Sequence, residues 1–135
     1  MSEIPHDEQL ARFLHSEHLR ADKSIKPNAF MPPKSLELSV TCHADGLGPD
    51  LWHRGWKVMK TMNKCPLRGR ADLSAGRVRQ ARPLDAVPAP IDDDAHHAHV
   101  VNWPPLEQKH LHKALALELS TAATFVECPT SAPPG

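Results

Sequence analysis

The sequence predicts an α+β fold, a small and mostly antiparallel sheet with about three helices packed on it. Apolar and polar side chains alternate over residues 36–42, as in a strand with one buried face. Over residues 49–63 and 106–127 apolar side chains instead recur at spacings of three and four, which is typical of helices. The resulting order of helix, strand, helix, two or three strands and helix favours helices gathered on one face of the sheet.

The chain of 135 residues has the size of one ordinary domain. We expect a single compact domain over residues 1–128 and a disordered, proline-rich tail over residues 129–135. The sequence has no apolar run of about 18 residues, and its first residues are acidic where a secretory signal would be basic. We therefore expect a soluble, cytoplasmic protein that does not engage a membrane. Three cysteines without C-x-x-C spacing indicate reduced thiols rather than a disulfide framework or a zinc ribbon.

The first half of the chain is predicted to contain a helix, a loop, a strand and a second helix. Apolar residues recur near helical spacing over residues 7–20, without Gly or Pro, and predict the first helix. Three prolines within residues 26–33 predict a loop, because proline removes a backbone donor and restricts the residue before it. The strand at residues 36–42 follows. The second helix begins with Pro49 at its first position and ends before Pro66.

The second half is predicted to contain short strands and one long helix. Residues 69–73 and 77–82 favour two short strands joined by an Ala-Gly turn. Residues 86–90 are limited by proline and fit a sheet edge or a loop. A β-prone segment at residues 100–103 precedes the last helix, over residues 106–127, which is rich in Ala and Leu.

The net charge of zero conceals a basic segment. From His53 to Arg82 the chain carries nine Lys or Arg and one acid, Asp72, so this segment holds +8 and the remainder −8. Such a partition creates a local field that attracts anions. The candidate anion-binding residues are Lys26, Arg68, Arg70, Arg77 and Arg79. A basic, solvated sheet face is the simpler alternative, and the scarcity of aromatic residues between Lys57 and Arg82 weakens a single-stranded nucleic-acid site.

Residues 92–99 bring three aspartates and three histidines together. If residues 97–103 are extended, His97 and His99 project from the same face of the strand, about 7 Å apart. Two such imidazoles can chelate a divalent metal together with a carboxylate, Asp94 or Asp45, or with His43, and nearby acids keep imidazoles basic enough for proton transfer. His97 and His99 are therefore candidate catalytic residues and metal ligands. A solvated loop before an edge strand is the simpler alternative.

The remaining histidines offer one further candidate. His43 follows the first strand, at a strand end where functional loops gather, and is the third candidate catalytic residue. The pairs His15 with His18 and His110 with His112 are expected on helix surfaces, and neither forms the H-E-x-x-H arrangement of a zinc hydrolase. The sequence also lacks a G-x-S-x-G elbow and a phosphate-binding glycine loop.

Four short strings carry a resemblance. They are Lys-Pro-Asn-Ala-Phe at 26–30, Leu-Ser-Val at 38–40, Gly-Arg-Ala at 69–71 and His-His-Ala-His-Val-Val-Asn-Trp-Pro at 96–104. Through them the chain resembles a family of small bacterial proteins of unknown function, over most of the span from Leu14 to Glu127. The resemblance implies no activity, cofactor or catalytic residue. It implies only that the loop, the first strand and the His-Trp-Pro strand belong to one structural unit.

Two functions remain open from the sequence. The first is a binding or accessory module whose basic segment, residues 53–82, engages an anionic partner such as nucleic acid or an acidic protein. The second is a histidine-dependent phosphoester hydrolase or nuclease, with or without a divalent metal, in which Arg70 and Lys26 hold the phosphate. The binding module requires less special geometry and is preferred. Both hypotheses require the fold to gather the basic segment and the histidines around one concavity.

Overall fold

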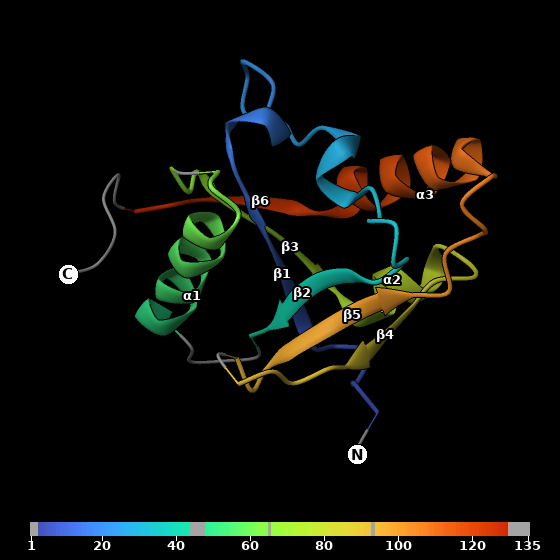
Figure 1. The fold of residues 1–135 in the computed structure, drawn as a ribbon, viewed down its shortest axis with the longest axis horizontal. Helices are drawn as coiled ribbons and strands as arrows, with labels where there is room; N and C mark the ends of the chain where they lie inside the picture. The colour runs from blue at the N-terminus through green and yellow to red at the C-terminus, as the bar shows by residue number, and fades with distance from the viewer. Residues whose placement is uncertain (1–2, 44–47, 65, 93, 130–135) are drawn as a thin grey trace.

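A computed structural model of the chain describes residues 3–43, 48–64, 66–92 and 94–129. Six strands form one antiparallel sheet in the order β4-β5-β2-β1-β3-β6, which confirms the predicted fold class (Figure 1). The strands are β1 (Gln9–Leu14), β2 (Leu38–Cys42), β3 (Gly69–Ser74), β4 (Asp85–Pro88), β5 (His97–Val101) and β6 (Thr124–Glu127). Residues 130–135 of the predicted tail lie outside the described residues.

Helices cover the sheet on both faces. The α-helices are α1 (Gly48–Thr61), α2 (Ala75–Gln80) and α3 (Lys109–Ala122), and the two 3-10 turns are η1 (Ser16–His18) and η2 (Pro27–Phe30). Helix α1 packs on Ala11 and Phe13 of β1, whereas α2 and α3 pack in the cluster that contains Leu10 and Leu14 of the same strand. We call these sides the α1 face and the α3 face. The expectation that all helices share one face is therefore wrong.

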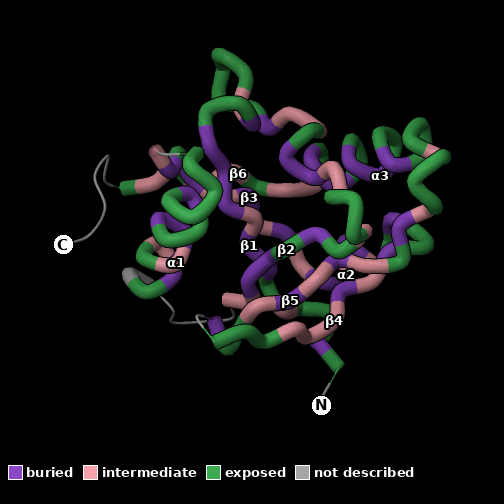
Figure 2. The backbone as a smooth tube through the Cα atoms, in the orientation of Figure 1, coloured by how far each residue is buried: buried purple, intermediate pink, exposed green. Residues whose placement is uncertain are grey.

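Residues 7–20, predicted as a helix, form the central strand β1 and the turn η1. Leu10 and Leu14 point to the α3 face, Ala11 and Phe13 point to the α1 face, and all four are buried. Most of β1 is accordingly coloured as buried or intermediate in Figure 2. A strand that is covered on both faces does not alternate apolar and polar residues, so its sequence imitates a buried helix.

Residues 77–82, predicted as a strand, lie largely in α2. The Ser74 hydroxyl accepts a hydrogen bond from the backbone N–H of Arg77 at 3.1 Å and caps this helix. Ala75 and Val78 are buried in the α3-face cluster. An Arg-Val-Arg run fits a strand and a single helical turn equally well, and the capping serine favours the helix.

The last helix ends earlier than predicted, at Ala122, and residues 124–127 form β6 instead. Gly69 on β3 allows this edge strand to approach closely, because a Cβ at Gly69 would lie 2.5 Å from the carbonyl oxygen of Val126. The Phe and Val of β6 favour an extended backbone.

The other predicted elements are confirmed with small shifts. The strand at residues 36–42 is β2, the helix at 49–63 is α1 and the strand at 69–73 is β3. Residues 86–90 overlap the edge strand β4, where Pro88 is tolerated. None of the described helices is both long and apolar enough to cross a membrane.

Candidate functional site

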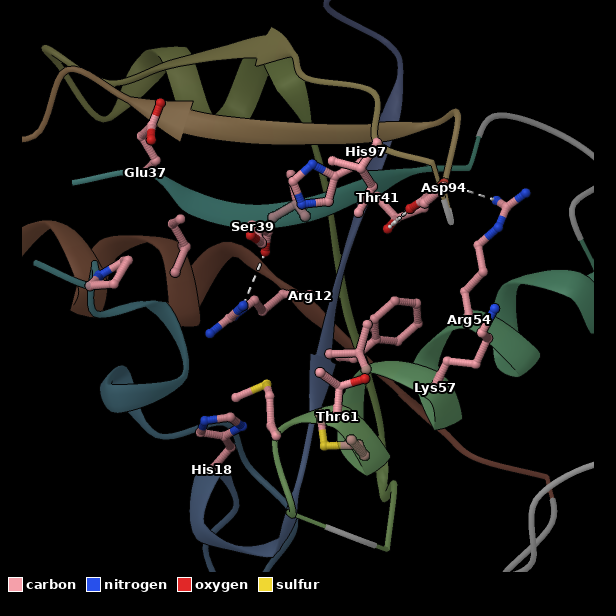
Figure 3. Close-up of a pocket in the computed structure, with 18 of the residues that line it drawn as sticks. Arg12, His18, Glu37, Ser39, Thr41, Arg54, Lys57, Thr61, Asp94 and His97 are labelled. Atoms are coloured by element: carbon pink, nitrogen blue, oxygen red, sulfur yellow. Dashed lines mark hydrogen bonds and ion pairs between the residues drawn. The ribbon is translucent and has the colours of Figure 1, made fainter. Parts of the chain in front are cut away.

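A cavity of about 490 Å³ lies between β1, β2 and α1, and the segment that follows η2 forms part of its wall (Figure 3). Its lining is mostly apolar and includes Phe13 from β1, Leu38 from β2 and Met59 from α1. Polar side chains also line the cavity, among them Arg12 from β1, Ser39 from β2 and His97 from β5 (Figure 3). Pockets that hold small organic molecules have volumes of roughly 300–1,000 Å³ and this kind of lining.

The cavity exists because β1 and β2 separate. Ala11 and Thr41 form the last pair of the two strands in this direction. In the same register Phe13 would pair with Ser39, but the described ladder contains no such pair. The sheet is therefore split between its two central strands, and both residues line the cavity.

Arg12 bridges this split with its side chain. Its Nε donates a hydrogen bond to the carbonyl oxygen of Ala29 at 2.9 Å, and its Nη1 donates to that of Ser39 at 3.0 Å. Burial lowers the pKa of Arg12 to about 10, so the guanidinium is still charged at neutral pH. No acidic side chain in the described ranges forms an ion pair with it. Because a guanidinium has five N–H donors, donors remain for a ligand.

The apolar wall is rich in methionine. Three of the four methionines of the chain, Met31, Met59 and Met62, line the cavity. Met62, Val58 and Ile91 are also large apolar side chains that stay exposed. Methionine is unbranched and flexible, so this wall can adapt to an apolar ligand, and a bound ligand would cover the exposed side chains.

Asp94 anchors the end of the cavity near α1. Its Oδ2 accepts a hydrogen bond from the Thr41 hydroxyl at 2.7 Å, and its Oδ1 accepts one from the backbone N–H of His96 at 2.9 Å. Arg54 Nη1 lies 3.5 Å from Asp94 Oδ1 and is buried without a hydrogen-bond partner in the described part of the chain. The predicted metal ligand Asp94 is thus committed to Thr41, His96 and Arg54.

His97 and His99 lie side by side on β5, as predicted, with ring centroids 4.9 Å apart. His97 lines the cavity, and its Nδ1 donates to the Ala89 carbonyl at 2.9 Å, which leaves the lone pair of the neutral ring on Nε2. Burial, and then the charge of His97, lower the pKa of His99 despite Glu37. Within the described ranges, His, Cys, Asp and Glu form no group of three placed to hold a metal ion.

His43 belongs to a different cluster, on the α1 face over β3. Its Nε2 lies 3.1 Å from Asp72 Oδ1, which also accepts a hydrogen bond from Arg70 Nε at 2.9 Å. The Arg70 guanidinium lies 4.7 Å from the centre of the Trp52 ring. These contacts tie α1 to the sheet and engage the His43 ring with Asp72.

The basic segment is spread over both faces of the sheet, and among the described residues four of its nine cations form ion pairs with acids of this chain, namely Arg54, Lys64, Arg70 and Arg79. Arg79 Nε lies 2.6 Å from Asp85 Oδ1, and Lys64 Nζ lies 3.1 Å from Glu17 Oε1. Arg77 on α2 donates to the Gln80 side chain at 2.6 Å.

Two further candidate anion-binding residues lie apart from the cavity. Arg68 is exposed beside a second cavity, of about 370 Å³, and Lys26 precedes η2. The fold therefore does not gather the five candidate anion-binding residues around one concavity.

Two histidine pairs that were expected on the surface contain buried rings. His15 and His18 stack with ring centroids 3.7 Å apart, and the His15 backbone N–H donates to His18 Nδ1 at 3.2 Å. His112 is 2% exposed and donates from Nε2 to the Pro104 carbonyl at 2.6 Å. These imidazoles satisfy local backbone groups, which is why they tolerate burial.

Sequence reasoning found Asp94 and His97, which line the cavity, but missed Arg12 and Ser39. Arg12 lies within residues 7–20, whose apolar spacing predicts a helix. An arginine flanked by buried residues was the signal available, because burial of a guanidinium requires specific partners.

Neither a protein-family model, a curated protein nor a solved structure matches the chain. The resemblance to a family of small bacterial proteins remains a prediction, and the function has to be inferred from the site.

Proposed function

We propose that the protein binds a small amphipathic carboxylate, a molecule with an apolar body and one anionic group, in the cavity between β1, β2 and α1. The sequence predicts an anionic partner, and we propose that this partner is a small molecule. It depends on the Arg12 guanidinium, which is charged, lines the cavity and has no acidic partner among the described residues.

The chemistry of the cavity supports this class of ligand. Arginine holds a carboxylate with two parallel hydrogen bonds, and Arg12 is kept in place by the carbonyls of Ala29 and Ser39. Met59 and Met62 offer an apolar surface for the body of the ligand. A carboxylate at Arg12 would compensate a cation whose hydrogen-bond acceptors in the described part of the chain are backbone carbonyls.

The test compares decanoate with decanol by isothermal titration calorimetry. Decanoate is expected to bind with one-to-one stoichiometry and a Kd on the order of 1–100 µM, at least about tenfold tighter than decanol. The variant Arg12→Gln should remove this preference. Arg68→Gln, which removes an exposed cation outside the cavity, should preserve it.

Two results would contradict the proposal. One is equal affinity of the native protein for decanoate and decanol, because the anionic group would then contribute nothing. The other is an equal loss of decanoate affinity in Arg12→Gln and Arg68→Gln, because any surface cation would then serve.

A further inference from the structure

The split between β1 and β2 exposes backbone groups as well as the Arg12 side chain. In antiparallel strands, alternate residues direct their N–H and C=O toward the same neighbour. The backbone N–H of His43 donates to the Gln9 carbonyl at 2.9 Å, so the odd-numbered residues of both strands face each other. Phe13 and Ser39 belong to this set and therefore direct their backbone groups into the split.

These groups are only partly satisfied. The Ser39 carbonyl accepts from Arg12 Nη1 at 3.0 Å. The Ser39 N–H would donate to the Phe13 carbonyl if the ladder continued, but the pairing of the described strands stops before that position. Ser39 is exposed and lines the cavity, so its N–H is accessible to a ligand.

From this geometry we infer that the ligand carries a secondary amide next to its carboxylate, as an N-acyl amino acid does. The inference rests on the proposed function and specifies its ligand. The amide carbonyl accepts from the Ser39 N–H, and the amide N–H donates to the Phe13 carbonyl, as a short inserted strand would. The carboxylate binds Arg12, which lies beside Ser39.

The apolar part of such a ligand has a defined place. Phe13 and Met59 line the same cavity on the α1 face. An acyl chain or an apolar side chain that leaves the amide toward α1 would therefore meet an apolar wall. The same chemistry occurs at the carboxyl end of an apolar peptide, so both sources have to be compared.

Calorimetry with matched probes tests the inference. The probes are N-decanoylglycine, its N-methyl analogue N-decanoylsarcosine, and a fatty acid whose main chain is as long as that of the whole N-decanoylglycine molecule. N-decanoylglycine should bind roughly tenfold tighter than the fatty acid, which lacks both amide hydrogen bonds, and also tighter than N-decanoylsarcosine, which lacks only the N–H donor. Acetyl-trileucine with a free carboxyl end is a further probe. If it binds tighter than N-decanoylglycine, the source is a peptide end, and if weaker, an acylated amino acid.

Backbone NMR provides a direct readout that needs no substitution. The Ser39 amide proton should move downfield with N-decanoylglycine but not with the fatty acid. The Val40 amide, which faces β5, is the matched control and should move little with either probe.

Equal affinities for the acylglycine and the fatty acid, with no Ser39 shift, would overturn the amide inference and leave the proposed function standing. Absence of binding by all carboxylate probes would overturn both.

Discussion

Phe13 and Ser39 occupy the positions where the next hydrogen-bonded pair of β1 and β2 would form, yet they do not pair, and both residues line the cavity. The Arg12 side chain binds the Ser39 carbonyl in place of a β1 backbone donor. The split sheet thus has a charged side chain at its opening.

Replacement of Arg12 by Met should lower the free energy of unfolding by about 1–3 kcal/mol, because the Ala29 and Ser39 carbonyls lose a charged donor. Arg12→Lys should also be destabilised, since a single ammonium group lacks the forked geometry that serves both carbonyls. Urea denaturation checks both variants. Arg68→Met, at an exposed position, is the control and should change stability by less than about 0.5 kcal/mol. Equal stability of Arg12→Met and the native protein would contradict a bridging role.

The variant Asp94→Asn should lose about 2–4 kcal/mol of unfolding free energy, because the half-buried Arg54 guanidinium, whose Nη1 is buried, would lose its only described counter-charge. Thr41→Val removes only the hydroxyl donor at 2.7 Å and should cost about 1 kcal/mol. The exposed Asp92→Asn serves as the matched control. Thermal unfolding at neutral pH measures all three, and an unaltered midpoint for Asp94→Asn would be inconsistent with the ion pair.

Acid should destabilise the protein through His18. Burial, then the charges of His15 and Arg12, lower its pKa from 6.5 to about 3, while Glu17 opposes the shift. Because the folded-state pKa is the lower one, the unfolded chain binds more protons between these values. The contribution of His18 to the free energy of unfolding is therefore fully present above pH 6.5 and is lost as the pH falls toward about 3.

Between pH 7 and pH 5 the loss from His18 should be about 1 kcal/mol, after a reduction for its partial solvation. His18→Asn retains an acceptor for the His15 N–H without titrating, so its stability should fall less over this range. Urea denaturation at the two pH values measures the difference. An identical pH dependence in both proteins would rule out His18 as the source.

The sequence predicted the fold class, β2 and α1 because their patterns are simple. In β2 the side chains of Leu38 and Val40 are buried and that of Ser39 between them is exposed, and α1 has one apolar side. The prediction of a helix over β1 was wrong because a central strand that is covered on both faces does not alternate apolar and polar residues. Without β1 as a strand, its separation from β2 could not be predicted either. Asp94 and His97 could be predicted as site residues because carboxylates and imidazoles are common metal ligands. The groups of Phe13 and Ser39 that would face the proposed ligand are backbone atoms. Their exposure depends on strand register and cannot be predicted from the residue types.

Gly55 sets the distance between α1 and the sheet. A Cβ at this position would lie 2.7 Å from Phe13 Cδ1 and 2.9 Å from Leu67 Cδ2, and both side chains are buried. Gly55→Ala should therefore destabilise the protein by about 1–3 kcal/mol, although alanine favours helices by about 1 kcal/mol. Chemical denaturation gives the sign directly. A stabilised variant would mean that α1 packs more loosely than the structure indicates.

The most direct test of carboxylate binding uses protein labelled with ¹³C in the methionine and leucine methyl groups, titrated with decanoate. The methyl signals of Met31, Met59 and Met62 should shift and show contacts with the methylene groups of the ligand. The methyl signals of Leu117, exposed on α3 and outside the cavity, should stay in place. Shifts at Leu117 as large as those at Met59, or no shift at any of the three methionines, would contradict binding in the split sheet.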